Sequence, residues 1–515
     1  MTLNTSTAEP SIHDLDAARS TLLRLEEPLW VLRSAHGYSF THQNPGGGWL
    51  AYAPAQTPGS LGDPTFRASY GLQAAYYAGA MANGIASAEM VIALGKAGLL
   101  GSFGSAGMTA DRIEAAVKLV QAALPTGPYA FNLINSPNEP AMEQNAVEVF
   151  LRNQVRLIEA SAYLDLTPAL VQYRAAGLSL DEQGRIHIAN RVIAKLSRKE
   201  VAKRFLEPPS EDLLRRLVEA GKITPEQAEL ARRVPVADDI TVEADSGGHT
   251  DNRPLVGVLP AIIALRDELQ AKHNFPTAVR IGAGGGIGAP EAALAAFMMG
   301  AAYIVTGSVN QACVEAGASL HTRQLLAQAA MTDVIMAPAA DMFEMGVRVQ
   351  VLKRGTMFAM RGSKLFELYQ RYESIEEIPP AEREKIEKQI FKRSLDEVWE
   401  DTVNFFQARD PRQIERALKD PHQKMALIFR WYLGLSSRWS SVGEAGREMD
   451  YQIWCGPSMG VFNDWVRGTP LEAVENRHVV EVASHLLTGA AYLLRVRLLQ
   501  MQGVSIPNAL QRYRP

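Results

Sequence analysis

The chain has 515 residues and a mass of 56.3 kDa, which at about 150 residues per domain allows roughly three domains, or one large α/β barrel with additions. Apolar residues make up 47% and charged residues 21%, a balance that excludes a disordered, collagen-like or coiled-coil protein. The net charge of −4 excludes a globally basic protein, so we expect neither nucleic acid nor a membrane surface as a partner.

Cysteine usage and the N-terminus point to the same compartment. The two cysteines, Cys313 and Cys455, lie far apart in the sequence, so we expect neither a disulfide framework nor a metal site. The first residues carry acids and no apolar core, unlike a secretory signal. The uncharged stretches 68–88 and 292–314 are interrupted by glycine, amide and hydroxyl residues, and we interpret them as buried segments rather than membrane spans. A reducing cytoplasm is the expected location.

Residues 1–60 are expected to form an arm. A helical pattern covers residues 14–32, and the stretch that follows is rich in glycine, proline and aromatic residues, which predicts irregular structure.

From residue 78 onward, short β-like runs alternate with helical patterns. We predict eight strands at 78–85, 98–104, 129–134, 155–162, 191–197, 239–245, 278–284 and 302–308. Strands that alternate with helices indicate parallel βαβ units. Eight such units are typical of a (β/α)8 TIM barrel, here over residues 61–330, with a doubly wound sheet as the alternative.

Two regions depart from the alternation. Residues 198–236 are charged, have a helical pattern and contain two adjacent prolines, which indicates a helical insertion over one rim of the barrel. Residues 331–515 have the pattern of a mostly helical C-terminal domain. The expected fold class is therefore α/β, a TIM barrel with a helical insertion and a helical C-terminal part.

Two glycine-rich turns predict a phosphate site. GAGGGIGAP (residues 282–290) follows the seventh strand and matches a dinucleotide fingerprint, which also requires an acid about 20 residues later. The next strand ends instead in Thr306-Gly307-Ser308, with no carboxylate. In a barrel, the turns after the last two strands form the usual phosphate site. A cofactor with one terminal phosphate, such as FMN, therefore fits better than a dinucleotide, although the glycines could simply permit tight turns.

The segment EADSGGHTDNRP, which starts at Glu243 at the end of the sixth strand, is the best candidate for chemistry. Gly247 and Gly248 allow the backbone to approach a planar ligand. His249 follows them on a loop where barrels carry catalytic residues, and a histidine there can donate a proton at neutral pH. One of the two acids, Glu243 or Asp245, points into the barrel mouth in one interpretation and makes a structural hydrogen bond to the loop in the other.

Polar residues also lie in other strands, where a packed core would avoid them. Asn132 and Lys195 occupy the third and fifth strands, and buried side chains of these types need partners. A flavin would provide such partners, as would internal hydrogen bonds.

These residues resemble the FMN-dependent barrel family that contains the nitronate monooxygenases and the flavin enoyl-[acyl-carrier-protein] reductases. The resemblance is carried by AMANGIAS, FNLI, EADSGGH, AGGGI and TGS. It is closer to the PfaD-type branch of polyunsaturated fatty acid and polyketide synthases, and extends over residues 60–505 through LGDPTF, EASAYLDLTPALVQYR, DDITVEADSGGHTDNRPL, TGSVNQACVEAG, TDVIMAPAADMFEMGVRVQVLKRGTMF, FRWYLGLSSRW and DYQIWCGPSMGVFNDW.

The resemblance implies a trans-acting enoyl reductase in which NADPH (or NADH) reduces FMN, and the flavin reduces an enoyl thioester carried on an acyl carrier protein. A nitronate monooxygenase and a non-catalytic synthase scaffold are the alternatives. It implies that His249 is catalytic, that backbone at Ala82, Asn83 and Gly84 contacts the flavin ring, and that Asn132 and Lys195 bind its polar edge or ribityl chain. It assigns the phosphate to Gly284, Gly285, Gly286, Gly307 and Ser308, and a homodimer is the family expectation.

A basic stretch predicts where the carrier protein docks. Residues 346–371 contain six Lys or Arg residues against the single acid Glu367, a local charge of +5. Carrier proteins are typically acidic, so a basic patch would attract them, although a solvated basic face would have the same composition. The expected docking residues are Arg348, Lys353, Arg354, Arg361 and Lys364.

Overall fold

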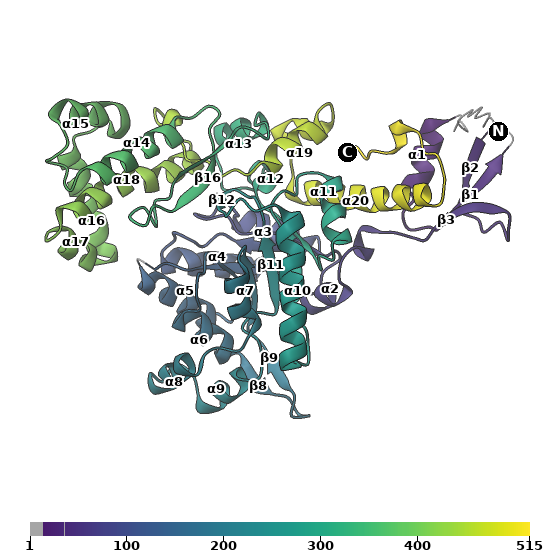
Figure 1. Ribbon diagram of the computed structural model, residues 1–515, viewed down its shortest axis with the longest axis horizontal. Coiled ribbons are helices and arrows are strands. Elements are labelled where there is room, and N and C mark those ends of the chain that lie inside the picture. Colours follow the sequence, from purple (N-terminus) through teal and green to yellow (C-terminus); the bar gives the residue numbers. More distant parts are fainter. Residues whose placement is uncertain (1–13, 35–36, 138) are drawn as a thin grey trace, which may run out of the picture.

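The computed structural model describes residues 14–34, 37–137 and 139–515, and its centre is a closed barrel of eight parallel strands (Figure 1). Around the barrel the order is β10-β11-β13-β14-β4-β5-β6-β7. The strands are β4 (Tyr76–Ala78), β5 (Leu100–Phe103), β6 (Ala130–Ile134), β7 (Leu157–Ser161), β10 (Arg191–Leu196), β11 (Asp239–Glu243), β13 (Arg280–Gly284) and β14 (Ile304–Thr306). The predicted TIM barrel is confirmed, and closure of the sheet excludes the doubly wound alternative.

The barrel strands are short apolar runs that are buried on both faces, as expected for parallel strands covered by helices. The prediction for the first strand is wrong: the strand is Tyr76–Ala78, and residues 79–85 form the turn after it. Glycine and asparagine explain the difference, since Asn83 and Gly84 both have positive φ, which a strand does not accommodate.

Helices surround the barrel, as in other (β/α)8 proteins. In chain order they are α3 (Ala88–Lys96), α4 (Ala110–Ala123), α5 (Pro140–Arg152), α6 (Pro168–Ala176), α7 (Lys199–Leu206), α10 (Leu255–His273), α11 (Pro290–Met298) and the single turn α12 (Ser308–Gln311).

A buried ion pair closes the end of the barrel where the strands begin. Arg280 at the start of β13 donates to both oxygens of Asp239 on β11, at 2.6 and 2.9 Å. Tyr70, on helix α2 (Pro64–Tyr70), donates its hydroxyl to the same carboxylate. Above this pair, Thr241 bridges the hydroxyls of Tyr77 and Tyr303 at 3.0 Å each. The lower barrel is therefore filled, and ligand access is from the other end.

The predicted insertion is helical and lies away from the open end. Helices α8 (Glu211–Glu219) and α9 (Pro225–Ala231) pack with α6, next to the hairpin β8 (Leu178–Leu180) and β9 (Ile186–Ile188). In Figure 1 they sit at the end of the barrel opposite β12 (Gly248–His249).

The arm is more regular than expected. Helix α1 (Leu15–Leu23) is followed by an antiparallel sheet, order β2-β1-β3, formed by β1 (Leu29–Ser34), β2 (Gly37–Thr41) and β3 (Trp49–Ala53). The predictions of a helix to residue 32 and of irregular structure after it are therefore wrong. The sheet packs on the last helix, α20 (Val479–Met501), whose buried Arg495 donates to carbonyls at Leu22, Arg24, Leu25 and Glu27.

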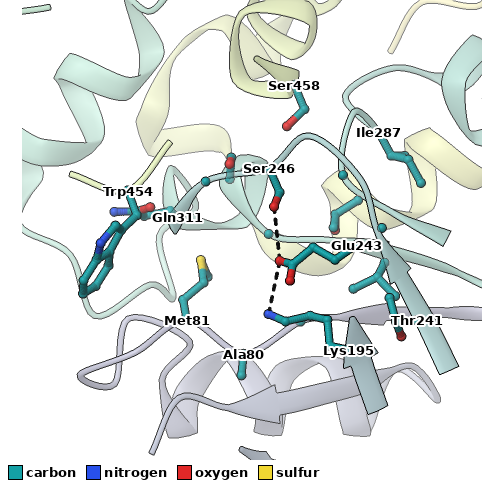
Figure 2. Close-up of a pocket in the computed structure, with 18 residues that line it drawn as sticks. Ala80, Met81, Lys195, Thr241, Glu243, Ser246, Ile287, Gln311, Trp454 and Ser458 are labelled. Carbon is teal, nitrogen blue, oxygen red and sulfur yellow. Dashed lines mark hydrogen bonds and ion pairs between the residues drawn. The ribbon is translucent and has the colours of Figure 1, made fainter. Parts of the chain in front are cut away.

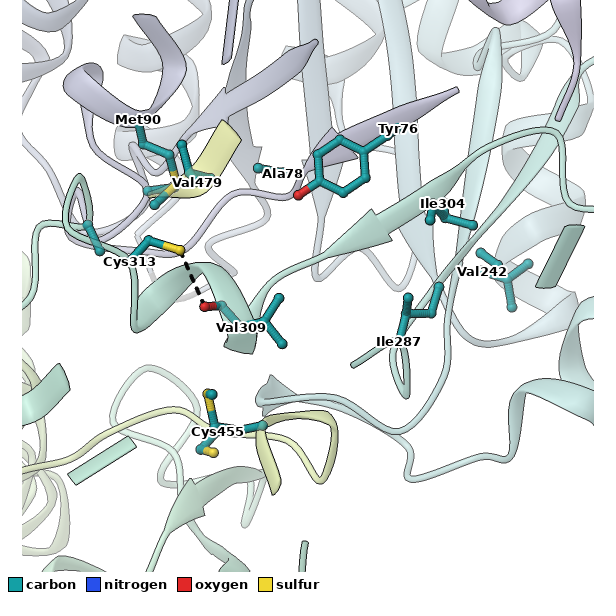
Figure 3. Close-up of a cluster of buried hydrophobic side chains, with 14 of the residues drawn as sticks. Tyr76, Ala78, Met90, Val242, Ile287, Ile304, Val309, Cys313, Cys455 and Val479 are labelled. Carbon is teal, nitrogen blue, oxygen red and sulfur yellow. Dashed lines mark hydrogen bonds between the residues drawn. The ribbon is translucent and has the colours of Figure 1, made fainter. Parts of the chain in front are cut away.

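The region after the barrel covers its open end. Strands β15 (Val334–Pro338) and β16 (Arg348–Leu352) form a sheet with β12, and one helix precedes them and others follow. These are α13 (Leu320–Ala327), α14 (Phe358–Arg371), α15 (Pro380–Ile386), α16 (Leu395–Arg409), α17 (Pro411–Ala417), α18 (Pro421–Val442) and α19 (Ser458–Val466). One apolar core joins this region to the barrel, and Figure 3 shows part of it, with Cys455 and Val479 in the same cluster as Tyr76 and Ile304.

In the described part of the chain, one helix is long and apolar enough to cross a membrane. This helix is α20, and 67% of its most apolar window is buried inside the protein, as in the core helix of a globular fold. The stretches 68–88 and 292–314 instead contain the barrel strands β4 and β14 and their flanking helices.

Candidate functional site

A pocket opens at the carboxyl ends of five neighbouring barrel strands, β4, β10, β11, β13 and β14. It encloses about 630 Å³, open solvent included. Figure 2 shows Lys195, Thr241 and Glu243 on one side and Trp454 on the other. The lining residues are Gly79, Ala80, Met81, Lys195, Thr241, Glu243, Ser246, Gly247, Gly284, Gly285, Ile287, Val305, Thr306, Gly307, Ser308, Gln311, Trp454 and Ser458.

A cation held between two carboxylates forms one wall. The Lys195 ammonium lies 3.2 Å from Glu159 Oε1 and 3.6 Å from Glu243 Oε1. Burial disfavours the charge on Lys195, but the two carboxylates outweigh it and raise the pKa of the ammonium. Burial raises the pKa of Glu243, against the lowering effect of Lys195. The wall therefore presents an ammonium group that two carboxylates hold in place and that can donate a hydrogen bond to an electron-rich group of a ligand.

Two glycine turns form an anion cradle at the other end of the pocket. The N–H groups of Gly286 and Gly307 donate to no described residue. A Cβ built on either glycine would meet no atom within 4 Å, so both face open space. Gly285 has a φ of +83°, and its backbone packs against Ala244. Free N–H donors around an open space at two helix starts fit a phosphate group, so these residues suit FMN.

His249 lies at the rim rather than among the lining residues. Its strand β12 pairs with β16, with His249 opposite Val349. Its Nε2 atom is 3.0 Å from Asp341 Oδ2. Burial disfavours the imidazolium, but the hydrogen bond and charge of Asp341 outweigh that effect, so the pKa of His249 is raised. The imidazolium can therefore persist near neutral pH and act as a proton donor.

The structure brings many of the predicted cofactor residues into one pocket. Lys195, Gly247, Gly284, Gly285, Gly307 and Ser308 line it, and Gly248 and Gly286 adjoin it.

Asn132, Ala82, Asn83 and Gly84 are not among these lining residues. The Asn132 amide donates to the Glu159 carbonyl at 3.0 Å and to Ser161 Oγ at 2.6 Å. The N–H groups of Asn83 and Gly84 donate to the carbonyls of Ala106 and Gly104 in the loop after β5. Gly79, Ala80 and Met81, immediately before that turn, line the pocket instead.

Sequence reasoning missed the part of the pocket supplied by the C-terminal region. Trp454 and Ser458 line it, and Gly456 N–H donates to Ser308 Oγ at 2.9 Å. The backbone at Gly247 packs so closely on Cys455 that a Cβ would lie 2.8 Å from its nitrogen. The conspicuous motif DYQIWCGPSMG was the available signal, but nothing in a linear pattern places residue 454 beside residue 247.

The basic stretch divides into paired and unpaired cations. Arg361 forms an ion pair with Asp450, which is fully buried, so its inclusion among the docking residues is corrected. Arg354 pairs with Asp333, and Lys364 with Glu382. Arg348 and Lys353 are exposed, and neither has an ion-pair partner among the described residues. These two remain the clearest candidates for an external anionic partner.

Comparison with known proteins identifies two regions. Residues 73–362, more than half of the chain, match the nitronate monooxygenase family model. Residues 372–451 match the inserted helical domain of [acyl-carrier-protein] S-malonyltransferase.

Similar proteins come from lipid and polyketide systems. The chain is 50% identical to a component of the polyunsaturated fatty acid synthase of Thraustochytrium sp. over 95% of its own length, and 47% identical to the polyketide biosynthesis protein PksE of Bacillus subtilis over 86%. It spans 33% and 58% of these two relatives.

Among solved structures, the enoyl reductase domain of MlnA, from the macrolactin cluster of Bacillus amyloliquefaciens, is 41% identical, with a TM-score of 0.81. The match covers 86% of this chain and 99% of that domain. FabK from Thermotoga maritima, at 17% identity and a TM-score of 0.50, shares the fold. The chain therefore belongs to the flavin-dependent nitronate monooxygenase family.

Proposed function

We propose that this chain is an FMN-dependent enoyl reductase that uses NADPH or NADH and acts in trans on a polyketide or polyunsaturated fatty acid synthase. Its substrate is an α,β-unsaturated thioester on an acyl carrier protein, and the proposal places it in the cytoplasm as a homodimer. The observation that carries the proposal is one pocket with a phosphate cradle at Gly286 and Gly307, a fixed cation at Lys195, and a proton donor, His249, at its rim. The MlnA enoyl reductase domain supports the same assignment.

A bound FMN would supply the hydride chemistry between the nicotinamide and Cβ of the enoyl group, and Gly286, Gly307 and Lys195 would hold it in the pocket. The chain supplies the rest. Lys195 stabilises negative charge beside the pocket, and Glu159 and Glu243 hold its ammonium in place. His249 provides the proton for Cα, so one hydride and one proton saturate the double bond. The carboxylate of Asp341 orients the imidazole and stabilises its protonated form.

A nitronate monooxygenase is the second candidate, because the family model carries that name. In that chemistry the histidine acts as a base and must be neutral before the reaction. The raised pKa of His249 favours the protonated donor, which supports the reductase over the base.

Absorbance spectroscopy of the purified protein tests the proposal. We expect a yellow protein whose flavin bands bleach when NADPH is added without oxygen, and recover when an enoyl thioester is added. Bleaching by a nitronate without oxygen, with no recovery when the enoyl thioester is added, would establish the second candidate. A protein that takes up no FMN would instead be a non-catalytic scaffold.

Gly307→Ala tests the phosphate cradle. Gly307 has a φ of −131° and a ψ of −74°, and an added Cβ meets no protein atom within 4 Å, so the methyl group enters the space assigned to phosphate, and the Tm of the variant reports any cost to folding. Loss of one charge-assisted hydrogen bond is worth roughly 1.5–3 kcal/mol, so we expect FMN affinity to fall at least about tenfold. Fluorescence titration of the apoprotein measures it. Gly47→Ala, at another open glycine, is the control, and unchanged affinity in Gly307→Ala would remove Gly307 from the cradle.

The pH dependence of enoyl reduction tests His249. Because the pKa of His249 is raised, the protonated donor persists above the usual pH of about 6.5, and kcat/KM should fall only as pH rises through the raised value. Asp341→Asn removes the main stabilising partner, so this alkaline limb should move to lower pH. His249→Ala should keep FMN and lose most turnover. A rate that rises with pH through the same limb would make His249 a base and contradict the proposal.

Charge reversal on the basic surface tests whether an acyl carrier protein docks on the proposed C-terminal domain, residues 331–515. Reversing Arg348 and Lys353 to Glu should raise KM for carrier-bound substrate at least about fivefold at low salt. At low ionic strength, salt screens the attraction between these cations and an acidic carrier protein only weakly, so its loss has the largest effect. A small thioester mimic should be reduced as before. The exposed pair Arg33→Glu and Arg233→Glu is the control. An equal effect on both substrates would exclude carrier docking at this surface.

A further inference from the structure

A second cavity lies beside the first, between the ends of β5 and β6 and the starts of α4 and α5. It encloses about 340 Å³ when the open solvent at its mouth is included, and it is the smaller of the two cavities. Its residues are mostly apolar and include two flexible methionines: Ser105, Ala106, Gly107, Met108, Ile113, Asn132, Leu133, Ile134, Ser136, Met142, Glu143, Ala146 and Arg409. No part of the proposed reaction so far uses it.

The polar side chains at the base of the cavity are already engaged with the protein. Ser105 donates its hydroxyl to the Asn132 carbonyl. The Asn132 amide donates to the Glu159 carbonyl and to Ser161 Oγ. These donors are therefore not offered to a ligand, in contrast to the free N–H groups of the phosphate cradle.

Glu143, the one carboxyl group among the described lining residues, is also hydrogen-bonded within the protein. Its Oε1 atom accepts from Tyr163 at 2.9 Å and from the Thr167 hydroxyl. Burial raises the pKa of Glu143 against the lowering effect of those two hydroxyls. Because its oxygen already accepts two hydrogen bonds from the protein, covering this carboxyl group with hydrocarbon costs less than covering an unbonded one.

Arg409 is the one cation in the wall, and a carboxylate neutralises it. It comes from the end of α16 in the C-terminal region and donates to Glu139 Oε2 at 2.6 Å. The ion pair joins α16 to the turn before α5. Of the two ionisable side chains in the described lining, Arg409 is therefore ion-paired and Glu143 is hydrogen-bonded within the protein.

The two cavities share a wall. The ideal Cβ position of Gly107, in the second cavity, lies 2.3 Å from Asn83 Oδ1, in the turn that follows the first pocket's Gly79–Met81 lining. Asn132 of the second cavity pairs in register with Glu159, which holds Lys195 in the first. Both cavities lie at the carboxyl ends of the barrel strands, on either side of the turn at residues 82–84.

We propose that the second cavity receives the hydrocarbon chain of the enoyl substrate while the thioester and double bond occupy the first pocket. The assignment rests on the proposed function and adds its substrate class: enoyl groups with a chain extending beyond the double bond. Each buried methylene favours binding roughly fourfold. Selectivity for chain length therefore arises at this cavity, and the methionines let it adapt to different chains.

Filling the cavity tests the assignment. Ala146→Leu on α5 and Ile113→Phe on α4 add volume from two different helices, and both residues are buried in the cavity wall. Ala141→Leu is the matched control, the same change at an exposed position of α5. The probes are crotonyl and trans-2-decenoyl N-acetylcysteamine thioesters, which need no carrier protein. Flavin content and Tm report folding, and calorimetry measures binding of saturated decanoyl N-acetylcysteamine.

We expect wild-type kcat/KM to be at least about tenfold higher for decenoyl than for crotonyl thioester. Each filling variant should lose that preference, keep crotonyl reduction within about twofold of wild type and bind the decanoyl probe at least about tenfold more weakly. The cavity assignment would be overturned if kcat/KM fell equally for both substrates. It would also be overturned if both filling variants folded and kept the wild-type preference for the longer chain. If the wild-type protein reduces neither thioester, the proposed function fails. The binding measurement tests the cavity assignment separately: if the filling variants bind the decanoyl probe as tightly as wild type, that assignment is overturned.

Discussion

Glu159 is a carboxylate with no exposed surface, and the mouth of the barrel is organised around it. Its Oε2 atom accepts from the Ala80 N–H at 2.9 Å, and its Oε1 atom pairs with Lys195 at 3.2 Å. It thereby links the ends of β4, β7 and β10. An isolated buried charge is costly, and breaking such a pair typically costs about 3–5 kcal/mol. The cation in the pocket and the turn after β4 therefore both depend on this one side chain.

The two ends of the barrel have different roles: side chains at the closed end stabilise the fold, and side chains at the open end form the pocket. At the closed end, Asp239 and Arg280 satisfy one another, and helix α2 covers them. At the open end, the glycine turns keep their N–H groups free, and Lys195 has more carboxylate around it than one cation requires. Backbone N–H groups without an acceptor, and carboxylates that outnumber the cations beside them, are unfavourable in a folded protein unless a ligand supplies the missing partners. Their concentration at one end is what identifies the site.

The C-terminal region is part of this site. Trp454 forms a wall of the first pocket, Arg409 borders the second cavity, and Asp341 sets the protonation of His249. Asn83, in the turn between the cavities, donates to Ser437 on α18 at 3.0 Å. A partner that docks on the helices would therefore contact the same elements that shape the substrate space.

The sequence alone predicted eight strands alternating with helices, favoured a barrel over a doubly wound sheet, and indicated the glycine turns and the candidate histidine, because each depends on residue types at short spacing: apolar runs, glycines in turns, a histidine after a strand. It missed the end of α1, the N-terminal sheet and the first strand's position, where turn residues and tertiary packing override local pattern. It also placed Arg361 on the surface, whereas Asp450 holds it inside. Only the tertiary structure decided which residues meet across long separations, such as residue 249 with 341 and 308 with 456, because those contacts depend on how packed elements lie in space and not on any pattern along the chain.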